Sequence, residues 1–475
     1  MCGRNHVADS NSVSNFHEII TRHTDIDLSI DFERTSVKGT TAITAECISE
    51  ISEIILDTSY LKIDSVTVDG KPTQWELQPR SEPNGSPLHV RLARRYTNGE
   101  SVYIKIEFET TTQSTGLQWF SAEQADDKKH PFMFSQCEPV HARSIFPCQD
   151  APSIKSTFRI GVLSPLPVVA SGIPEHDLIF PPLESSLSVK HYIFNQDIPT
   201  SNYLFSVASG NMVGEQIGPK SYLYCSPGNM DACREELKPD LRAIINAAEK
   251  LVFEYPWPLY NLVVLPKSFH LGGMENPIFN FYSATVISGD CENVNVVAHE
   301  FAHSFSGNLV TNASWEHFWL NEGWTVYIER FILREVRGEA EETLRAMVGW
   351  QELEYGIESY GGDDSLDTAM VLDFRGKRPD DIMSTIVYEK GYTFLRYLEE
   401  TVGRSSWLPF VPYYFTKFSK KAVDSTQMKF VRPLFEGLIS VDGSLALQVY
   451  EKYKTFYHPT CLRLIRSVLK NGGLL

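Results

Sequence analysis

The pattern of hydrophobic and polar residues divides the chain into regions. Between about residues 25 and 210 it consists of short alternating runs, such as residues 25–32 (DIDLSIDF), 51–56 and 102–108 (VYIKIEF), separated by Gly, Pro, Asn and Asp. Alternation with a period of two places the apolar residues on one face of a strand. The pattern therefore predicts an antiparallel β domain over residues 1–210.

Helical periodicity dominates the next part of the chain. Apolar residues recur every three to four positions in residues 241–253 and 294–309, and two short strand-like runs lie around residues 261–266 and 280–286. This spacing is typical of helices that bury one apolar face. It predicts an α+β domain over residues 211–403.

The end of the chain also has the pattern of helices, including residues 447–457 and 461–470. Residues 408–418 and 434–453 carry apolar faces that need a partner. We therefore expect residues 404–475 to form an all-α tail that is able to self-associate.

Charge and cysteine content narrow the class of protein. With 43 Lys and Arg against 60 Asp and Glu, the net charge is -17, which repels nucleic acid and anionic lipid. No apolar run approaches the roughly 18 residues of a membrane-spanning helix. The eight cysteines include no Cys-x-x-Cys pair, which favours buried free thiols. Because residues 1–20 also lack the pattern of a secretory signal, we expect a cytoplasmic protein without nucleic-acid or membrane partners.

Residues 299–303 (HEFAH) carry the strongest chemical signal. On a helix, His299 and His303 lie one turn apart on the same face, so both imidazoles can reach one metal ion at roughly 2.0–2.1 Å. The alternative is an amphipathic helix with two coincidental histidines. Glu300 is adjacent to a ligand and faces the same way, so it can act as the general base toward a zinc-activated water.

Glu322 is the candidate third ligand, because it opens a second helical run nineteen positions after His303. Two histidines and one glutamate leave a fourth metal position open, as in catalytic zinc sites. Glu329 lies seven residues after Glu322, on almost the same helix face. It either orients a ligand imidazole or is a solvated surface glutamate.

The residues around this cluster resemble peptidase family M1, the zinc aminopeptidases. Besides the cluster, the matching stretches are residues 149–153 (QDAPS), 272–276 (GGMEN), 307–311 (GNLVT), 318–323 (FWLNEG), 388–391 (YEKG) and 428–435 (MKFVRPLF). They are most similar to the leukotriene A4 hydrolase and aminopeptidase B branch of the family. The resemblance implies a thermolysin-like zinc metallopeptidase domain over residues 211–403, with one zinc ion per chain.

The resemblance also implies an amine-binding site for the substrate. Glu275 matches the family's anchor for the substrate ammonium, and the neighbouring glycines let an extended peptide pair with this segment; a plain turn is the alternative. A second amine-binding segment is matched by Gln136 and Glu138. The implied substrate-binding residues here are Gln136, Glu138, Gly272, Gly273, Met274, Glu275 and Asn276.

Three further residues match functional positions of the family. Tyr388 matches the tyrosine whose hydroxyl stabilises the oxyanion, with core packing as the alternative. Asp380 matches a carboxylate that reads basic substrate side chains, with a helix N-cap before residues 382–388 as the alternative. Lys429 matches a lysine that binds the substrate carboxylate, although Gln427 replaces the arginine beside it.

The sequence departs from the leukotriene A4 hydrolase branch at several positions. Glu138 stands where that branch carries glutamine, and Leu271 and Met383 replace tyrosines, which argues against a lipid substrate. Only residues 423–427 separate two stretches that flank a full helical domain in the family. We therefore expect most of the C-terminal helical domain to be missing.

Together these observations predict a multidomain α+β hydrolase. It would combine an N-terminal antiparallel β domain, a thermolysin-like zinc metallopeptidase domain and a shortened all-α tail. The expected function is that of a zinc aminopeptidase, a metalloprotease that acts on short peptides with a free N-terminus. Two alternatives stay open: a lipid epoxide hydrolase that uses the same zinc, and a catalytically impaired binding or regulatory protein.

Overall fold

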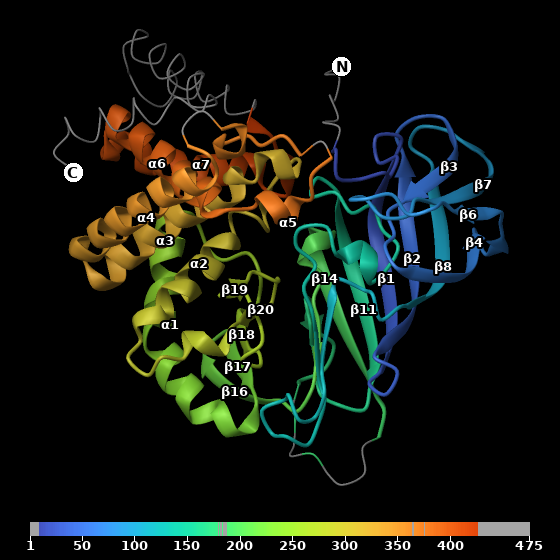
Figure 1. Ribbon diagram of the computed structural model, residues 1–475, viewed down its shortest axis with the longest axis horizontal. Coiled ribbons are helices and arrows are strands. Elements are labelled where there is room, and N and C mark those ends of the chain that lie inside the picture. Colours follow the sequence, from blue (N-terminus) through green and yellow to red (C-terminus); the bar gives the residue numbers. More distant parts are fainter. Residues whose placement is uncertain are drawn as a thin grey trace. The chain divides into compact units, whose positions relative to one another are not determined.

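The computed structural model describes residues 9–425 except residues 179, 181–182, 184–187, 363–364 and 375 (Figure 1). The chain forms two compact units. Unit 1 comprises Met1–Arg242 and Pro256–Val297, and unit 2 comprises Ala243–Tyr255 and Ala298–Leu475. The domain boundaries expected after residues 210 and 403 stay predictions.

The largest sheet of unit 1 has eight strands and confirms the expected β domain. In spatial order these strands are β13 (Ile173–Pro174), β14 (Lys190–Ser201), β11 (Lys155–Ser164), β1 (Ile19–Asp31), β2 (Ser36–Cys47), β8 (Ser101–Thr110), β4 (Leu61–Val68) and β5 (Lys71–Pro72). Alternate residues of β8, from Val102 to Phe108, are buried, as the period of two requires. Pairing in this sheet is antiparallel except between β1 and β11, which run parallel.

Three smaller sheets complete unit 1. The three-stranded sheet contains β3 (Ile51–Leu56), β7 (Leu88–Tyr96) and β6 (Trp75–Leu77), and the four-stranded sheet β12 (Val168–Ala170), β15 (Val207–Ser209), β10 (Phe132–Ser135) and β9 (Leu117–Phe120). The five-stranded sheet contains β16 (Val213–Gly218), β17 (Ser221–Cys225), β18 (Asn261–Val264), β20 (Phe279–Tyr282) and β19 (Gly273–Met274). The last of these sheets places β19 at an edge.

Two helices differ from their predicted bounds. α1 (Met230–Leu251) begins earlier than the periodicity indicated and contains Pro239. α2 (Asn295–His303) ends six residues before the predicted end. Its C-terminal carbonyl groups bond into a turn, in which the Asn308 N–H donates to the His303 carbonyl oxygen and Gly307 adopts a φ of 119°. A glycine tolerates this conformation without a steric penalty, so the helix stops directly after His303.

Helices dominate unit 2. The elements that follow α2 are β21 (Val310–Asn312), α3 (Trp319–Arg337), α4 (Glu339–Ser359), α5 (Pro379–Ile382), α6 (Thr385–Val402), α7 (Arg404–Phe418) and β22 (Lys421–Val423). Short 3-10 helices occur in both units. In unit 1 they are η1 (Ala142–Ser144), η2 (Asn202–Leu204), η3 (Pro227–Asn229), η4 (Ala284–Val286) and η5 (Glu292–Val294), and in unit 2 they are η6 (Trp315–His317) and η7 (Leu366–Thr368).

Aromatic packing joins α3 to α7. The Trp324 ring stacks on Trp407 with centroids 5.9 Å apart and on Tyr414 at 4.9 Å, and Phe415 meets it edge-on. α3 therefore covers the apolar face of residues 408–418, which the sequence predicted to need a partner. The predicted helices at 447–457 and 461–470 lie outside the described residues, as does most of the tail invoked for self-association.

The sequence favoured buried free thiols and contained no apolar run of the length of a membrane-spanning helix. Six cysteines fall within the described residues; all are free, and five of them are buried. Among the helices of the described residues, none is long and apolar enough to cross a membrane.

Candidate active site

Helices α2 and α3 bring together the three candidate metal ligands, all of which belong to unit 2. His299 and His303 occupy successive turns at the end of α2, and Glu322 lies in the first turn of α3. The two imidazole Nε2 atoms are 3.1 Å apart. Glu322 Oε2 lies 3.5 Å from His299 Nε2 and 3.4 Å from His303 Nε2. Three potential ligand atoms thus form a nearly equilateral triangle.

This triangle fits a tetrahedral metal ion. Two ligands held about 2.05 Å from a tetrahedral zinc lie about 3.3 Å from each other, which matches all three separations. Glu322 Oε2 is buried and receives no hydrogen bond from the described residues. A buried carboxylate oxygen in that state is costly unless a cation faces it, so the site is built for a metal.

Neighbouring groups fix the orientation of both imidazoles. Glu329 Oε2 lies 2.9 Å from His299 Nδ1, and Glu329 is 8% exposed, so it is not a solvated surface residue. His303 Nδ1 donates to the carbonyl oxygen of Ser306 at 2.8 Å and lies 3.1 Å from Thr325 Oγ1. Since a carbonyl can only accept, His303 is protonated on Nδ1 and its Nε2 lone pair is left for the metal.

The contribution of Ser306 was not predicted from the sequence. Its carbonyl oxygen reaches His303 because α2 stops at that residue and the chain turns back. Its hydroxyl donates to the carbonyl oxygens of Leu320 and Asn321, which ties the turn to the start of α3. The useful signal was Gly307, four residues after His303, which marks the end of a helix.

The carboxylates dominate the electrostatics of this cluster. Burial by itself lowers the pKa of His299, but the neighbouring carboxylates of Glu322 and Glu329 outweigh it and raise that pKa well above its usual value. Burial acts to raise the pKa of Glu322, yet the two imidazoles lower it to about 2. Glu322 is therefore an anion, the state in which a carboxylate binds a metal.

The candidate base and the candidate oxyanion donor also belong to unit 2. A carboxylate oxygen of Glu300 lies within 4.8 Å of a ring nitrogen of His303. Tyr388, in the first turn of α6, stacks on the His299 ring with centroids 6.1 Å apart and an interplanar angle of 20°. Phe318 packs edge-on against the Tyr388 ring, with centroids 6.0 Å apart.

The candidate amine-binding residues belong to unit 1. Gln136 and Met274 are brought together, since Gln136 Nε2 donates to Met274 Sδ at 3.2 Å. Gly273 and Met274 form the edge strand β19, and Gly272, directly before it, is exposed. Glu275 and Asn276 follow and are buried, while Glu138 is half-buried.

Two further candidate substrate-binding residues are Asp380 and Lys429. Asp380 is exposed within the short helix α5, and the helix that carries Tyr388 is capped instead by Ser384, whose hydroxyl accepts from the Ile386 N–H. The alternative that Asp380 is an N-cap is therefore wrong. Lys429 lies outside the described residues.

Comparison with known proteins defines the class of this site. The family models that match are the Peptidase M1 N-terminal domain over residues 20–204, the Peptidase family M1 domain over residues 235–438 and the Leukotriene A4 hydrolase C-terminal region over residues 410–469. The chain belongs to peptidase family M1, whose members are zinc metallopeptidases. Zinc is therefore its cofactor, in agreement with the donor set of the site.

Individual relatives match over most of this chain. A leukotriene A-4 hydrolase homolog from Botryotinia fuckeliana is 47% identical over 455 residues, which cover 95% of this chain and 70% of the relative. Leucine aminopeptidase 2 from Sclerotinia sclerotiorum is also 47% identical, over 95% of this chain and 74% of the relative. The structure of yeast LTA4 hydrolase in complex with bestatin aligns with a TM-score of 0.88 at 38% identity, over 97% of this chain and 71% of that one. The predicted family, fold class and type of enzyme are confirmed.

Proposed function

We propose that this protein is an aminopeptidase that releases N-terminal residues from short peptides at a zinc ion held by His299, His303 and Glu322. The observation that carries the proposal is the ligand triangle, with sides of 3.1, 3.4 and 3.5 Å, beside the Glu300 carboxylate. A relative that is 47% identical is named leucine aminopeptidase 2, which supports this choice of substrate.

The side chains of unit 2 have separate roles in this proposal. Bound zinc would supply a Lewis acid that polarises the scissile carbonyl and acidifies water. Glu300 accepts the proton of the attacking water and passes it to the leaving amine. The Tyr388 hydroxyl donates to the oxyanion as it forms. Glu329 and the Ser306 carbonyl hold the two imidazoles in position.

Recognition of the substrate's free amine is assigned to unit 1. Glu275 and Glu138 would pair with the ammonium group through charge-assisted hydrogen bonds, with Gln136 beside them. The edge position of β19 supports pairing of an extended peptide with Gly272, Gly273 and Met274, as in strand addition, and Asn276 follows in the same motif. Asp380 and Lys429 keep their proposed roles toward the substrate side chain and carboxylate.

A lipid epoxide hydrolase is the second candidate. It is favoured by the name of the Botryotinia fuckeliana relative, leukotriene A-4 hydrolase homolog. Three residues argue against it, because Leu271 and Met383 replace tyrosines of the leukotriene A4 hydrolase branch and Glu138 replaces its glutamine. We assign the peptide reaction as the main activity.

Two further parts of the proposal concern the setting of the enzyme. A cytoplasmic location is supported by the six described cysteines, which are free, as is usual in a reducing compartment. Self-association through residues 404–475 stays a prediction that particle size in solution will test.

The test uses one substrate set. Aminoacyl amides, a free tripeptide, its N-acetylated form and a lipid epoxide are incubated with the protein, with and without a zinc chelator. We expect chelator-sensitive release from the amides and the free tripeptide only, and turnover of the epoxide alone would refute the proposal. Glu275→Gln should lower the ratio of kcat/KM for the free tripeptide to kcat/KM for the acetylated one, because it removes the charge that pairs with the ammonium. An unchanged ratio would remove Glu275 from amine recognition.

A further inference from the structure

A buried ion pair joins the two helices that carry the zinc ligand Glu322 and the tyrosine Tyr388. Arg330 on α3 donates through Nη2 to Glu389 Oε1 on α6 at 2.6 Å. The two side chains are 6% and 9% exposed. The proposed reaction assigns no role to either residue.

Each member of this pair is adjacent in sequence to a group of the active site. Glu329, which precedes Arg330, pairs with His299. Tyr388, which precedes Glu389, stacks on the same His299 ring. Fixing Arg330 against Glu389 therefore fixes the rotation of α3 relative to α6, and with it the place of Tyr388 beside the zinc ligands.

The surroundings of the pair leave it little freedom. The Arg330 guanidinium lies 3.9 Å above the Tyr392 ring. On α4, a Cβ atom at Gly349 would lie 2.2 Å from Glu389 Oε2 and 2.3 Å from Arg330 Nη2. Only glycine at this position leaves room for both charged groups.

Stability alone does not account for the pair. Arg330 Nη1 and Glu389 Oε2 are buried and make no hydrogen bond within the described part of the chain. Two charges removed from water and only partly satisfied cost about as much as their attraction returns, and an apolar pair of similar volume would hold the helices together as well. What a charged pair adds is a specific distance and direction between the two helices that carry it.

We propose that Arg330 and Glu389 are positioning residues that hold the Tyr388 hydroxyl at the oxyanion site. The inference rests on the proposed peptidase function and deepens it. Each residue acts through Tyr388 and not on the substrate. Loss of the pair should therefore slow the chemical step and leave substrate binding unchanged.

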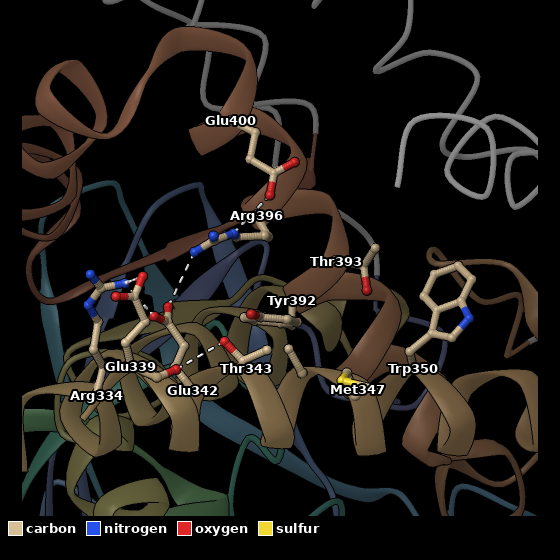
Figure 2. Close-up of a pocket in the computed structure, with 11 residues that line it drawn as sticks. Arg334, Glu339, Glu342, Thr343, Met347, Trp350, Tyr392, Thr393, Arg396 and Glu400 are labelled. Carbon is tan, nitrogen blue, oxygen red and sulfur yellow. Dashed lines mark hydrogen bonds and ion pairs between the residues drawn. The ribbon is translucent and has the colours of Figure 1, made fainter. Parts of the chain in front are cut away.

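The same helix α6 offers a matched control. Figure 2 shows Glu400 and Arg396 among the residues that line a cavity. This cavity has a volume of about 140 Å3, and Glu400 Oε1 lies 3.1 Å from Arg396 Nε. This is also an arginine–glutamate pair, but both of its side chains are more than a quarter exposed and it lies outside the site. Glu400→Gln removes the same charge from the same helix without touching the first turn of α6.

The test is a double-mutant cycle between Glu389→Gln and Tyr388→Phe, with kcat, KM, bound zinc and Tm measured for each variant. We expect Glu389→Gln to lower kcat by roughly tenfold or more, with KM and zinc unchanged, whereas Glu400→Gln keeps the parent kcat. In the Tyr388→Phe background, Glu389→Gln should lower kcat no further, because the group it positions is gone. A merely structural role would lower Tm and leave the kcat of the folded enzyme intact.

Two results would overturn the inference: an unchanged kcat in Glu389→Gln, or effects of the two substitutions that multiply. If Glu389→Gln does not fold, Gly349→Ala takes its place in the cycle, since it displaces the pair and keeps both charges, and the same two results apply. A parent protein without peptidase activity would refute the proposed function and the positioning role with it.

Discussion

The contact between α3 and α6 can be tested at Gly323, the residue after the ligand Glu322. A Cβ atom added there would lie 2.7 Å from Gly391 Cα and 2.9 Å from Gly391 C. Ordinary van der Waals contacts begin at 3.4 Å, so Gly323→Ala requires the two helices to move apart by about 0.7 Å to reach one. Because the atoms opposite are backbone, no side chain can rotate to relieve the contact.

The magnitude follows from two opposing effects. Overpacking a tight core costs roughly 1–3 kcal/mol, and replacing glycine by alanine in a helix interior returns about 1 kcal/mol. A net loss of up to about 2 kcal/mol in the free energy of unfolding should result. Glu322 and Tyr388 lie on the two helices that separate, so the active-site geometry should change by a similar distance. A displacement near 1 Å lowers turnover by roughly a hundredfold.

The assay compares Gly323→Ala with Gly356→Ala. Both glycines lie within helices, but a Cβ atom at Gly356 would meet side-chain atoms only, with Ile386 Cγ1 closest at 3.2 Å. We expect Gly323→Ala to lose both Tm and kcat, while Gly356→Ala stays close to the parent in kcat. A Gly323→Ala protein with the Tm and kcat of the parent would refute the tight crossing of α3 and α6.

Three other outcomes are expected. Glu300→Gln should keep its zinc and lose roughly a hundredfold or more in kcat, because only the base is removed; a loss of only a few-fold would contradict that role. Chelation should abolish hydrolysis until zinc is returned, and His303→Ala should bind less than one zinc per chain, so undiminished zinc in that variant would exclude His303 as a ligand. Burial lowers the pKa of Lys155 from 10.5 to about 7. Between these values the unfolded chain binds more protons than the folded one, so stability should rise with pH. Lys155→Met should flatten this rise in denaturant titrations at pH 7, 8 and 9, and an equal slope in both proteins would contradict the shift.

Local periodicity predicted much of the fold and the centre of the site. The strands of the β domain follow from alternation, and His299 and His303 share a helix face because the helical repeat places positions four apart together. Helix ends were predicted less well. α1 continues through Pro239, and α2 ends at His303 because the turn at Gly307 competes with further helix. Gly307 was a local signal for the end of α2, whereas no local pattern indicated that α1 passes through Pro239.

The groups that support the site could not be read from the sequence. Arg330 and Glu389 are 59 positions apart, and neither stands in a motif that predicts the other. The close approach of Gly323 and Gly391 is a property of two packed helices, although each glycine belongs to a recognised motif. The orienting group of His303 is the backbone carbonyl of Ser306, which every residue type possesses. Side-chain chemistry was visible in the sequence, whereas helix crossings and backbone acceptors required the structure.

The two imidazoles have chemically different supports, and this difference is testable. Glu329 presents a carboxylate to His299 and makes that ring a stronger donor to zinc, while His303 is held by a neutral carbonyl with Thr325 beside it. Glu329→Gln can keep a hydrogen bond but removes the charge, so zinc affinity should fall by roughly ten- to a hundredfold. Thr325→Val leaves the Ser306 carbonyl in place and should change zinc affinity much less. Competition with a chromophoric chelator measures both variants. If Thr325→Val weakened zinc binding as much as Glu329→Gln, the charge of Glu329 would not be what strengthens the His299 ligand.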